Sequence, residues 1–517
     1  MERIQILWAD DEMDLLKPHL LFLKDKGYDV ITATSGDEAL ELADKNDFAV
    51  VLLDENMPGI SGLETLTRLK SKHSGIPVIM ITKSEEEHLM EDAIGSKISD
   101  YLIKPVNPNQ ILLSLKKTLD KNRLISEKTN SSYAQQFRQI GMTMSDRLTW
   151  AEWAELYRKL VYWELELDKS NDEGMSEMLQ TQKVEANKIF CKFFENNYIG
   201  WLKGKGTNAP LFSHNLINEK VLPLLEKPEP VFLILIDNLR FDQWRIIQPF
   251  IAEYFKIEAE EMYSCILPSV THYARNAMFA GLMPSEIQKR YPQYWVSEGS
   301  EEGRNEHEAQ LLAEQLKRLG KDVKMGYKKV TQNHLGKKLV DNMNNLMQNK
   351  LNVIVYNFVD ILSHSRTEME FVRELTSDGK AYRSITSSWF NNSPLLEMIK
   401  YIASKKGRMV ITTDHGSIQV KQPSTFSGPK ELNANLRYKT GRGMSMESRD
   451  VFFIKNPSDA FLPEDSMGYN FAFAKEDNYL VYQNGFNKIV SIYKNSFQHG
   501  GLSMEETMVP VITLSAK

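Results

Sequence analysis

The chain has 517 residues, of which 42% are hydrophobic and 26% are charged, and its formal net charge at pH 7 is −6. This composition is typical of a folded protein with sizeable cores, and the acidic balance argues against a general nucleic-acid coat. The two cysteines provide no disulfide framework, and no apolar run reaches the roughly 18 residues that a membrane span needs. The charged pair Asp10-Asp11 follows the N-terminus too soon for a secretory signal, so we expect a cytoplasmic protein with no membrane contact.

Residues 1–122 alternate short apolar runs with helical patterns, as a doubly wound α/β domain does. The expected strands are Ile4–Ala9, Asp29–Thr32, Ala49–Leu53, Pro77–Ile81 and Asp100–Ile103. The expected helices between and after them are Glu12–Lys26, Ser35–Lys45, Gly62–Lys72, Glu85–Ile94 and Pro108–Asn122. Polar residues stand at the ends of these strands, namely Asp10, Asp11, Asp54, Thr82 and Lys104. Ligands bind at the carboxyl ends of parallel strands, so these residues predict a site.

The segments ILWADDE, VVLLDENMPGISG, VIMIT and DYLIKP occur here in an order and spacing that resembles the receiver domain of two-component response regulators. The resemblance implies that Asp10, Asp11 and Asp54 bind Mg²⁺, a cation that prefers oxygen ligands. Asp54 would accept a phosphoryl group from a sensor histidine kinase, while Lys104 and Thr82 would contact the phosphoryl oxygens. Any one of these aspartates alone is equally well explained as a helix cap. The ordered set favours the receiver, and we expect a homodimer on phosphorylation.

Residues 123–208 are polar and almost free of proline, and we assign them to a helical bundle or linker. Helices are expected over Asp120–Met142, Leu148–Leu167 and Gly174–Tyr198. The second carries a stripe at helical spacing, made of Trp150, Trp153, Leu156, Leu160, Trp163 and Leu167. We interpret the stripe as the core of the bundle rather than as a ligand pocket. No cluster of Lys and Arg forms a recognition helix, which makes a DNA-binding regulator the least favoured function.

Residues 209–517 contain three apolar runs that each end on a carboxylate. The runs are Val231–Ile236 before Asp237, Val353–Val359 before Asp360, and Met409–Thr413 before Asp414. Such runs are typical of strands buried on both faces of a parallel sheet, whose carboxyl ends meet at one edge. Three histidines accompany these or similar strand ends, and one hydroxyl stands at an expected helix start: His364, His415, His499 and Thr271. The set predicts a larger α/β domain with a site for two metal ions and a nucleophile.

The phrases LIDNLRFDQW, PSVTHYARNAMFAG, NFVDILSH, VITTDHGS and HGGLSMEETMVP are similar to the alkaline phosphatase superfamily, and in particular to the PglZ family. The resemblance divides the ligands into a first set of Asp237, Asp414, His415 and Thr271, and a second set of Asp360, His364 and His499. Mixed imidazole and carboxylate ligands suit catalytic Zn²⁺, expected at two per chain, with Mn²⁺ left open. A PglZ domain behind a receiver resembles PorX-type regulators, which are linked to type IX secretion.

The resemblance makes Thr271 the expected nucleophile, because coordination to a dication lowers the pKa of a hydroxyl. The alternative for an isolated threonine at a helix start is a capping role. Superfamily diesterases contact the phosphate through a neutral amide, and Asn276 lies about one helical turn beyond Thr271, with Arg275 alongside. We therefore expect a zinc-dependent phosphodiesterase that acts on nucleotides or oligonucleotides.

The stretch Ser424–Gly443 contains four basic residues among glycines and polar residues: Lys430, Arg437, Lys439 and Arg442. Such a stretch would guide an anionic chain into the site, or it would be an ordinary solvated loop. A second function stays open beside catalysis. In it, the metals stabilise a binding module that recruits a transcription or secretion component.

Overall fold

The computed structural model describes residues 4–73, 75–83, 98–145, 147–170, 172–206, 208–296, 305–362, 378–428, 435–446, 449–464 and 468–517, without the side chains of 120–128. The chain divides into two compact units, one of Met1–Ala134 with Lys169–Asp172 and one of Gln135–Asp168 with Glu173–Lys517. In the described part of the chain, no helix is both long and apolar enough to cross a membrane.

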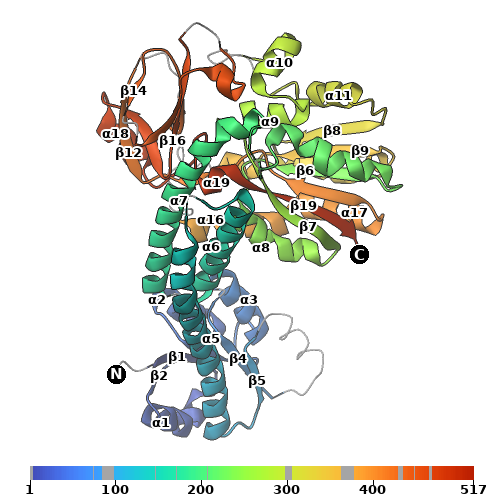
Figure 1. Ribbon diagram of the computed structural model, residues 1–517. Coiled ribbons are helices and arrows are strands. Elements are labelled where there is room, and N and C mark those ends of the chain that lie inside the picture. The colour runs from blue at the N-terminus through green and yellow to red at the C-terminus, as the bar shows by residue number, and fades with distance from the viewer. Residues whose placement is uncertain are drawn as a thin grey trace. The chain divides into compact units, whose positions relative to one another are not determined.

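The first unit contains a five-stranded parallel sheet in the order β2-β1-β3-β4-β5 (Figure 1). Its strands are β1 (Ile4–Ala9), β2 (Tyr28–Ala33), β3 (Val50–Asp54), β4 (Val78–Thr82) and β5 (Asp100–Ile103). Its helices are η1 (Met13–Leu16), α1 (Lys17–Asp25), α2 (Gly36–Lys45), α3 (Gly62–Lys72) and the start of α5 (Pro108–Thr143). Alternate residues of β1 enter the cores on opposite faces of the sheet, Leu7 on one side and Ile6 and Trp8 on the other. The expected helix Glu85–Ile94 lies outside the described residues.

The second unit includes two long helices, α6 (Trp150–Ser170) and α7 (Glu173–Leu202), which follow α5. The six residues of the apolar stripe on α6 are all buried. Trp153 lies with its ring 5.4 Å from that of Phe190 and 6.0 Å from that of Phe193, both on α7. The stripe is therefore core, as interpreted from the sequence, and it joins α6 to α7.

A six-stranded sheet in the order β7-β19-β10-β6-β9-β8 forms the centre of the second unit. Its strands are β6 (Val231–Ile236), β7 (Phe255–Ser264), β8 (Met325–Val330), β9 (Leu351–Tyr356), β10 (Arg408–Thr412) and β19 (Met508–Ala516). β10, β6, β9 and β8 are parallel, whereas β19 and β7 are antiparallel to their neighbours. Every residue of β6 and β9 is buried, which explains their continuous apolar sequences.

Helices cover both faces of this sheet (Figure 1). The helices of one face are α8 (Phe241–Ala252), α16 (Gly379–Asn391) and α17 (Pro394–Ser404). On the other face are α9 (Thr271–Ala280) and α11 (Glu308–Arg318), and α10 (Pro284–Arg290) contacts α9, whereas α12 (Asn333–Asp341) and α13 (Met343–Leu346) contact α17. Short helices complete the domain: η2 (Ser213–Asn215), η3 (Ile217–Val221), η4 (Leu222–Glu226), η5 (Pro292–Tyr294) and α19 (Met504–Thr507).

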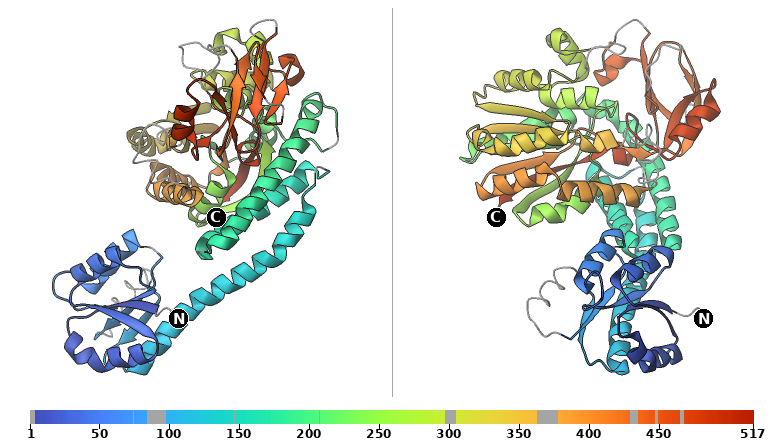
Figure 2. Two further views of the ribbon diagram at one scale, coloured as in Figure 1. Left: turned by 90° about the vertical axis from the view of Figure 1, so that its left-hand side faces the viewer. Right: turned by 180° about the vertical axis from the view of Figure 1, so that it is seen from behind.

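A β-rich part lies beside the six-stranded sheet (Figure 2). It consists of small sheets in the orders β11-β18, β14-β12-β17 and β13-β16-β15. Their strands are β11 (Ile418–Gln419), β12 (Gln422–Ser427), β13 (Tyr438–Gly441), β14 (Ser445–Met446), β15 (Val451–Ile454), β16 (Asn470–Ala474), β17 (Asn478–Tyr482) and β18 (Phe497–Gln498), accompanied by η6 (Pro457–Ala460) and α18 (Phe486–Tyr493). These small sheets were not predicted from the sequence.

Two of the expected strand ends differ in the structure. The apolar run Val353–Val359 leaves the sheet at Tyr356, and residues 358–362 are helical, so Asp360 lies on a helical turn. Val359 is buried without being in a strand, and this burial explains why its apolar character suggested one. His499 follows β18, which belongs to a two-stranded sheet and not to the large one.

Candidate metal centre

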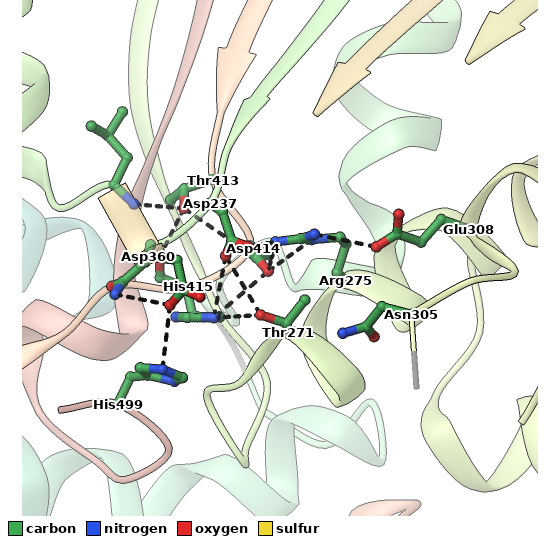
Figure 3. A network of polar contacts seen from close by, with 12 residues as sticks. Asp237, Thr271, Arg275, Asn305, Glu308, Asp360, Thr413, Asp414, His415 and His499 are labelled. Atoms are coloured by element: carbon green, nitrogen blue, oxygen red, sulfur yellow. Dashed lines mark hydrogen bonds and ion pairs between the residues drawn. The ribbon is translucent and has the colours of Figure 1, made fainter. Parts of the chain in front are cut away.

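Three buried side chains meet where β6 and β10 end, at the carboxyl edge of the parallel strands (Figure 3). Asp237, Asp414 and His415 each offer a ligand atom, and these atoms lie within 4.8 Å of one another. Asp237 directly follows β6, and the next residue, Asn238, turns the chain with a φ of 62°. Asparagine tolerates this left-handed conformation better than most residues. The ends of two adjacent parallel strands thus bring the residues of the first ligand set together.

Thr271 is the first residue of α9, and its hydroxyl faces the same cluster (Figure 3). Its Oγ1 lies 3.1 Å from His415 Nε2 and 3.5 Å from Asp237 Oδ1. The Nδ1 of His415 lies 3.2 Å from the carbonyl of Gly416 and can only donate to it, so the Nε2 of the neutral ring carries a lone pair toward Thr271. A ring nitrogen oriented in this way is ready to bind a metal.

Two residues of the second ligand set lie beside the first (Figure 3). His499 Nε2 is 3.5 Å from Asp360 Oδ1, and the amide of Asn238 donates to the same oxygen at 3.4 Å. The rings of His415 and His499 are stacked with their centroids 4.4 Å apart, which joins the two sets. His364, the remaining predicted ligand, lies outside the described residues.

Arg275 is the counter-charge of the first ligand set, a role that the sequence analysis missed. Its guanidinium is fully buried and pairs with Asp237, with Asp414 at 3.0 Å and with Glu308 at 3.2 Å. Its position four residues after Thr271 on α9 was a usable signal, since residues four apart share a helix face. Glu308 begins α11, and nothing local in the sequence connected it to the site.

The electrostatics of this cluster favour a further cation. Burial raises the pKa of Asp237 well above its usual value. The charge of Arg275 opposes this shift, whereas the nearby carboxylate of Asp414 adds to it. Burial would also raise the pKa of Asp414, but the charge of Arg275 beside it outweighs burial and lowers the pKa to about 2. Arg275 is shared by three buried carboxylates, of which Glu308 also pairs with Lys329 at 3.2 Å, so Asp237 and Asp414 have only a share of one guanidinium between them. With the oriented imidazole, this donor set fits a dication of the Zn²⁺ type.

Asn276 is buried on α9, five residues after Thr271. At 100° per residue it lies about 140° around the helix axis from Thr271, whereas Arg275 lies about 40° away. The expected contact of Asn276 with a phosphate oxygen stays a prediction. Figure 3 also draws Asn305, whose backbone carbonyl accepts a hydrogen bond from Lys329 at 3.0 Å. Asn305 was not among the predicted site residues.

The basic stretch Ser424–Gly443 is not a cationic channel wall over its described residues. Arg437 is fully buried and pairs with Glu506 at 2.6 Å. Lys439 is also buried, with its ammonium 5.2 Å from the Phe426 ring centre, and burial lowers its pKa to about 8. Arg442 is exposed, and Lys430 lies outside the described residues. Strands β12 and β13 turn this stretch inward, which a polar sequence with glycines did not reveal.

The first unit has an acidic cluster of its own. Ligand atoms of Asp10, Asp11 and Asp54 lie within 4.8 Å of one another at the ends of β1 and β3. Lys104 pairs with Asp10 at 2.8 Å and with Asp54 at 2.9 Å. Burial raises the pKa of Asp54, and the hydrogen bond from Lys104 only partly offsets the shift. Thr82 is buried at the end of β4. A carboxylate cluster of this kind suits a hard cation such as Mg²⁺.

Three family models match the chain in sequence. Residues 6–116 match the response regulator receiver domain, residues 123–202 match the PorX response regulator linker domain, and residues 216–514 match the BREX system PglZ alkaline phosphatase-like domain. The PglZ match covers more than half of the chain. The three domains follow one another in the predicted order, so the predicted domain families and α/β fold class are confirmed.

Individual relatives match at the receiver. The transcriptional regulatory protein SrrA of Staphylococcus aureus is 30% identical over 130 residues, which cover 25% of this chain and 54% of that protein, about half of its length. A CheY-like receiver domain from Methanospirillum hungatei JF-1 is 28% identical and covers 23% of this chain and 95% of its own, with a TM-score of 0.23. Vibrio cholerae CheY4 is 30% identical, covers 23% and 99%, and has a TM-score of 0.22.

Proposed function

We infer that this chain, which belongs to the PglZ alkaline phosphatase-like family and carries a response-regulator receiver and a PorX linker domain, is a metal-dependent phosphodiesterase under receiver control. The observation that carries the proposal is the meeting of Thr271 with Asp237 and His415 at the end of β6 and β10. A hydroxyl held between ligand groups at a helix N-terminus is placed to attack a phosphoryl group.

We assign the first ligand set and the second ligand set to two Zn²⁺ ions, with His364 completing the second. When bound, the ions would lower the pKa of the attacking hydroxyl and neutralise charge on the phosphoryl oxygens. The protein holds Thr271 by its helix start and keeps Asp237 and Asp414 in place through Arg275. We propose the amide N–H groups of Thr271 and His272 as further donors to the phosphoryl oxygens, since the next N–H, that of Tyr273, donates to the carbonyl of Val270 at 3.1 Å.

The proposed reaction has two steps. Thr271 Oγ1 gives up its proton to solvent and forms a bond to phosphorus while the bond to the leaving alkoxide breaks, and the alkoxide takes up a proton from solvent. Water then cleaves the threonyl phosphodiester, which restores the Thr271 hydroxyl and releases the phosphomonoester. Asn276 is the predicted contact of a nonbridging oxygen. A phosphodiester carries one negative charge per phosphate, which a neutral amide can contact, and by analogy with the superfamily we propose nucleotides or oligonucleotides as substrates. The match to the PorX linker domain supports a link to type IX secretion.

We propose Asp54 as the phosphoacceptor of the receiver, with Mg²⁺ bound by Asp10, Asp11 and Asp54, and a sensor histidine kinase as the phosphoryl donor. Lys104 already lies at hydrogen-bond distance from Asp54, where a phosphoryl oxygen would accept from it. Thr82 and Tyr101 share a hydrogen bond, so a contact between Thr82 and the phosphoryl group would reach Tyr101. We propose that a symmetric homodimer forms on phosphorylation.

Hydrolysis of an aryl phosphodiester by the zinc-loaded full-length protein tests the activity. Thr271→Val keeps the shape of the side chain, and we expect it to lower turnover by several orders of magnitude while the bound zinc is retained. Thr425→Val, an exposed threonine of the same domain, is the matched control and should leave turnover unchanged. Retained turnover in folded, zinc-loaded Thr271→Val would refute the covalent step. Absence of turnover in the wild-type protein would favour the binding-module function.

A further inference from the structure

The segment that runs from the end of α11 through β8 into α12 is strongly basic. Residues 317–338 contain eight lysines and arginines and a single acid, Asp322, so their formal charge is +7 in a chain whose total is −6. Six of the lysines are exposed or half-buried, and none of these six pairs with a carboxylate of the residues that the structure describes: Lys317, Lys321, Lys324, Lys328, Lys337 and Lys338. Cations that the protein does not neutralise itself create a positive potential that attracts anions.

This basic segment lies close to the candidate metal centre. β8 is an edge strand of the six-stranded sheet and runs parallel to β9, so its carboxyl end lies at the same edge as the metal centre. Helix α11 begins at Glu308, which pairs with Arg275 at 3.2 Å, and ends at Arg318. With 11 residues, α11 is about 16 Å long. The basic segment therefore begins about one helix length from the candidate metal centre.

Buried aromatic rings fix the short helix η5 beside the start of α9. The ring of His272, the residue after Thr271, stacks on Trp295 with the centroids 4.6 Å apart, and Trp295 directly follows η5. Trp295 also meets the ring of Tyr273 edge-on at 5.6 Å. All three rings are buried, and aromatic pairs of this geometry hold their segments together. Tyr294, the last residue of η5, is thereby held near Thr271.

Two tyrosines continue from η5 toward the basic segment. The ring of Tyr294 lies 5.3 Å from that of His307, the residue before α11, and is stacked with that of Tyr291 at 6.2 Å. The Tyr291 hydroxyl accepts a hydrogen bond of 3.5 Å from Arg318, at the end of α11. Both tyrosines are half-buried, so part of each ring meets solvent. A chain of contacts thus leads from the metal centre over two rings to the basic segment.

Partly exposed rings beside unneutralised cations suit one class of ligand. A single-stranded nucleic acid presents phosphates to the cations and unstacked bases whose faces stack on tyrosine. A duplex presents the same phosphates but keeps its bases stacked on one another. The stretch Ser424–Gly443, which the sequence made a candidate for guiding an anionic chain, has Arg437 and Lys439 buried and does not serve this purpose.

We propose that η5, α11 and the start of β8 form a binding surface for single-stranded oligonucleotides, which leads the strand to the metal centre. Tyr291 and Tyr294 stack on bases, while Lys317 and Lys321 contact phosphates. The inference rests on the proposed function and narrows its substrates to single strands. It assigns the recognition of bases to residues outside both ligand sets.

The test is fluorescence anisotropy of the full-length protein with a labelled oligothymidylate of about 12 nucleotides. The measurement is made with and without a chelator, so that cleavage of the probe does not enter. Tyr294→Leu removes a stacking ring, and we expect it to weaken binding by about 5- to 150-fold without changing the dependence on salt. Replacing both Lys317 and Lys321 by Gln should instead lower the slope of log affinity against log salt by about 0.7 for each lysine removed.

Matched controls are available elsewhere in the same unit. Lys455, which follows β15, and Lys488, on α18, are exposed, and their joint replacement by Gln removes the same charge from the β-rich part. Tyr162→Leu removes a tyrosine that is 51% exposed on α6. Both control proteins should bind the probe like the wild-type protein. The Lys317 and Lys321 variant should also hydrolyse the small aryl phosphodiester at the wild-type rate, because this substrate does not reach the lysines.

Wild-type affinity in folded Tyr294→Leu would overturn the inference, even if the lysine variant binds more weakly, because the surface would then attract any anion. Tighter binding of the annealed duplex than of the single strand would overturn it as well. If Tyr294→Leu does not fold, Tyr291→Leu takes its place in the same comparison. A wild-type protein that binds the probe in chelator but never cleaves an aryl phosphodiester would refute the proposed catalysis and leave the binding surface standing.

Discussion

Replacing Arg275 by methionine removes the one guanidinium that serves Asp237, Asp414 and Glu308. Because Arg275 is fully buried, water cannot solvate the carboxylates in its place. Removing one partner of a buried ion pair typically costs about 3–5 kcal/mol, and we expect Arg275→Met to lower the free energy of unfolding by about that amount in the presence of a chelator.

Zinc should stabilise the Arg275→Met variant more than the wild-type protein. A bound dication supplies the charge that Arg275→Met lacks, so the variant should gain more stability from zinc than the wild-type protein does. The assay is urea unfolding followed by tryptophan fluorescence, with and without zinc. The free energies are compared where the dependence on urea concentration, the m value, is the same for both proteins. Arg245→Met is the matched control: the Arg245 side chain is 37% exposed and pairs with Glu260 at 3.2 Å, so its replacement should cost no more than about 1 kcal/mol. A loss of stability in Arg275→Met as small as that in the control would refute the role of Arg275 as the buried counter-charge of the site.

Three further outcomes follow from the structure. Lys439 has a folded-state pKa of about 8, below its unfolded value, so wild-type stability should rise between about pH 8 and pH 10.5 as the native lysine loses its proton first. Lys439→Met should therefore be more stable than wild type at pH 7 by up to about 3 kcal/mol in urea unfolding, and the gain should vanish by pH 10.5. Asp54→Asn should abolish phosphorylation of the receiver by acetyl phosphate. It should also abolish the increase in molecular mass in solution that dimer formation produces with beryllofluoride and Mg²⁺. A dimer that still forms in Asp54→Asn would show that Asp54 does not control dimerisation. Asp360→Ala should lose about one equivalent of zinc by elemental analysis, and two retained equivalents would contradict its assignment as a ligand.

Much of the candidate site was predictable because its residues follow buried strands. Asp237 and Asp414 follow continuous apolar runs, which are typical of strands covered on both faces, and the carboxyl ends of parallel strands share an edge. The run before Asp360 shows the limit of this rule, because its last residues are helical. The receiver cluster of Asp10 and Asp54 follows the same rule. The stripe on α6 was predictable for a related reason, since helical spacing of large apolar residues requires a partner surface.

Tertiary structure alone decided which charges are buried and where loops meet. Glu308 reaches Arg275 from a separate helix, and Arg437, the residue before β13, reaches Glu506 from a stretch whose glycines and polar residues did not predict burial. The guanidinium of Arg240 likewise lies over the rings of Tyr382 and Phe497, which come from two distant segments. Local sequence determines strands and helices because backbone geometry repeats over a few residues. Pairing of buried charges depends on contacts between distant segments, which no periodic pattern records.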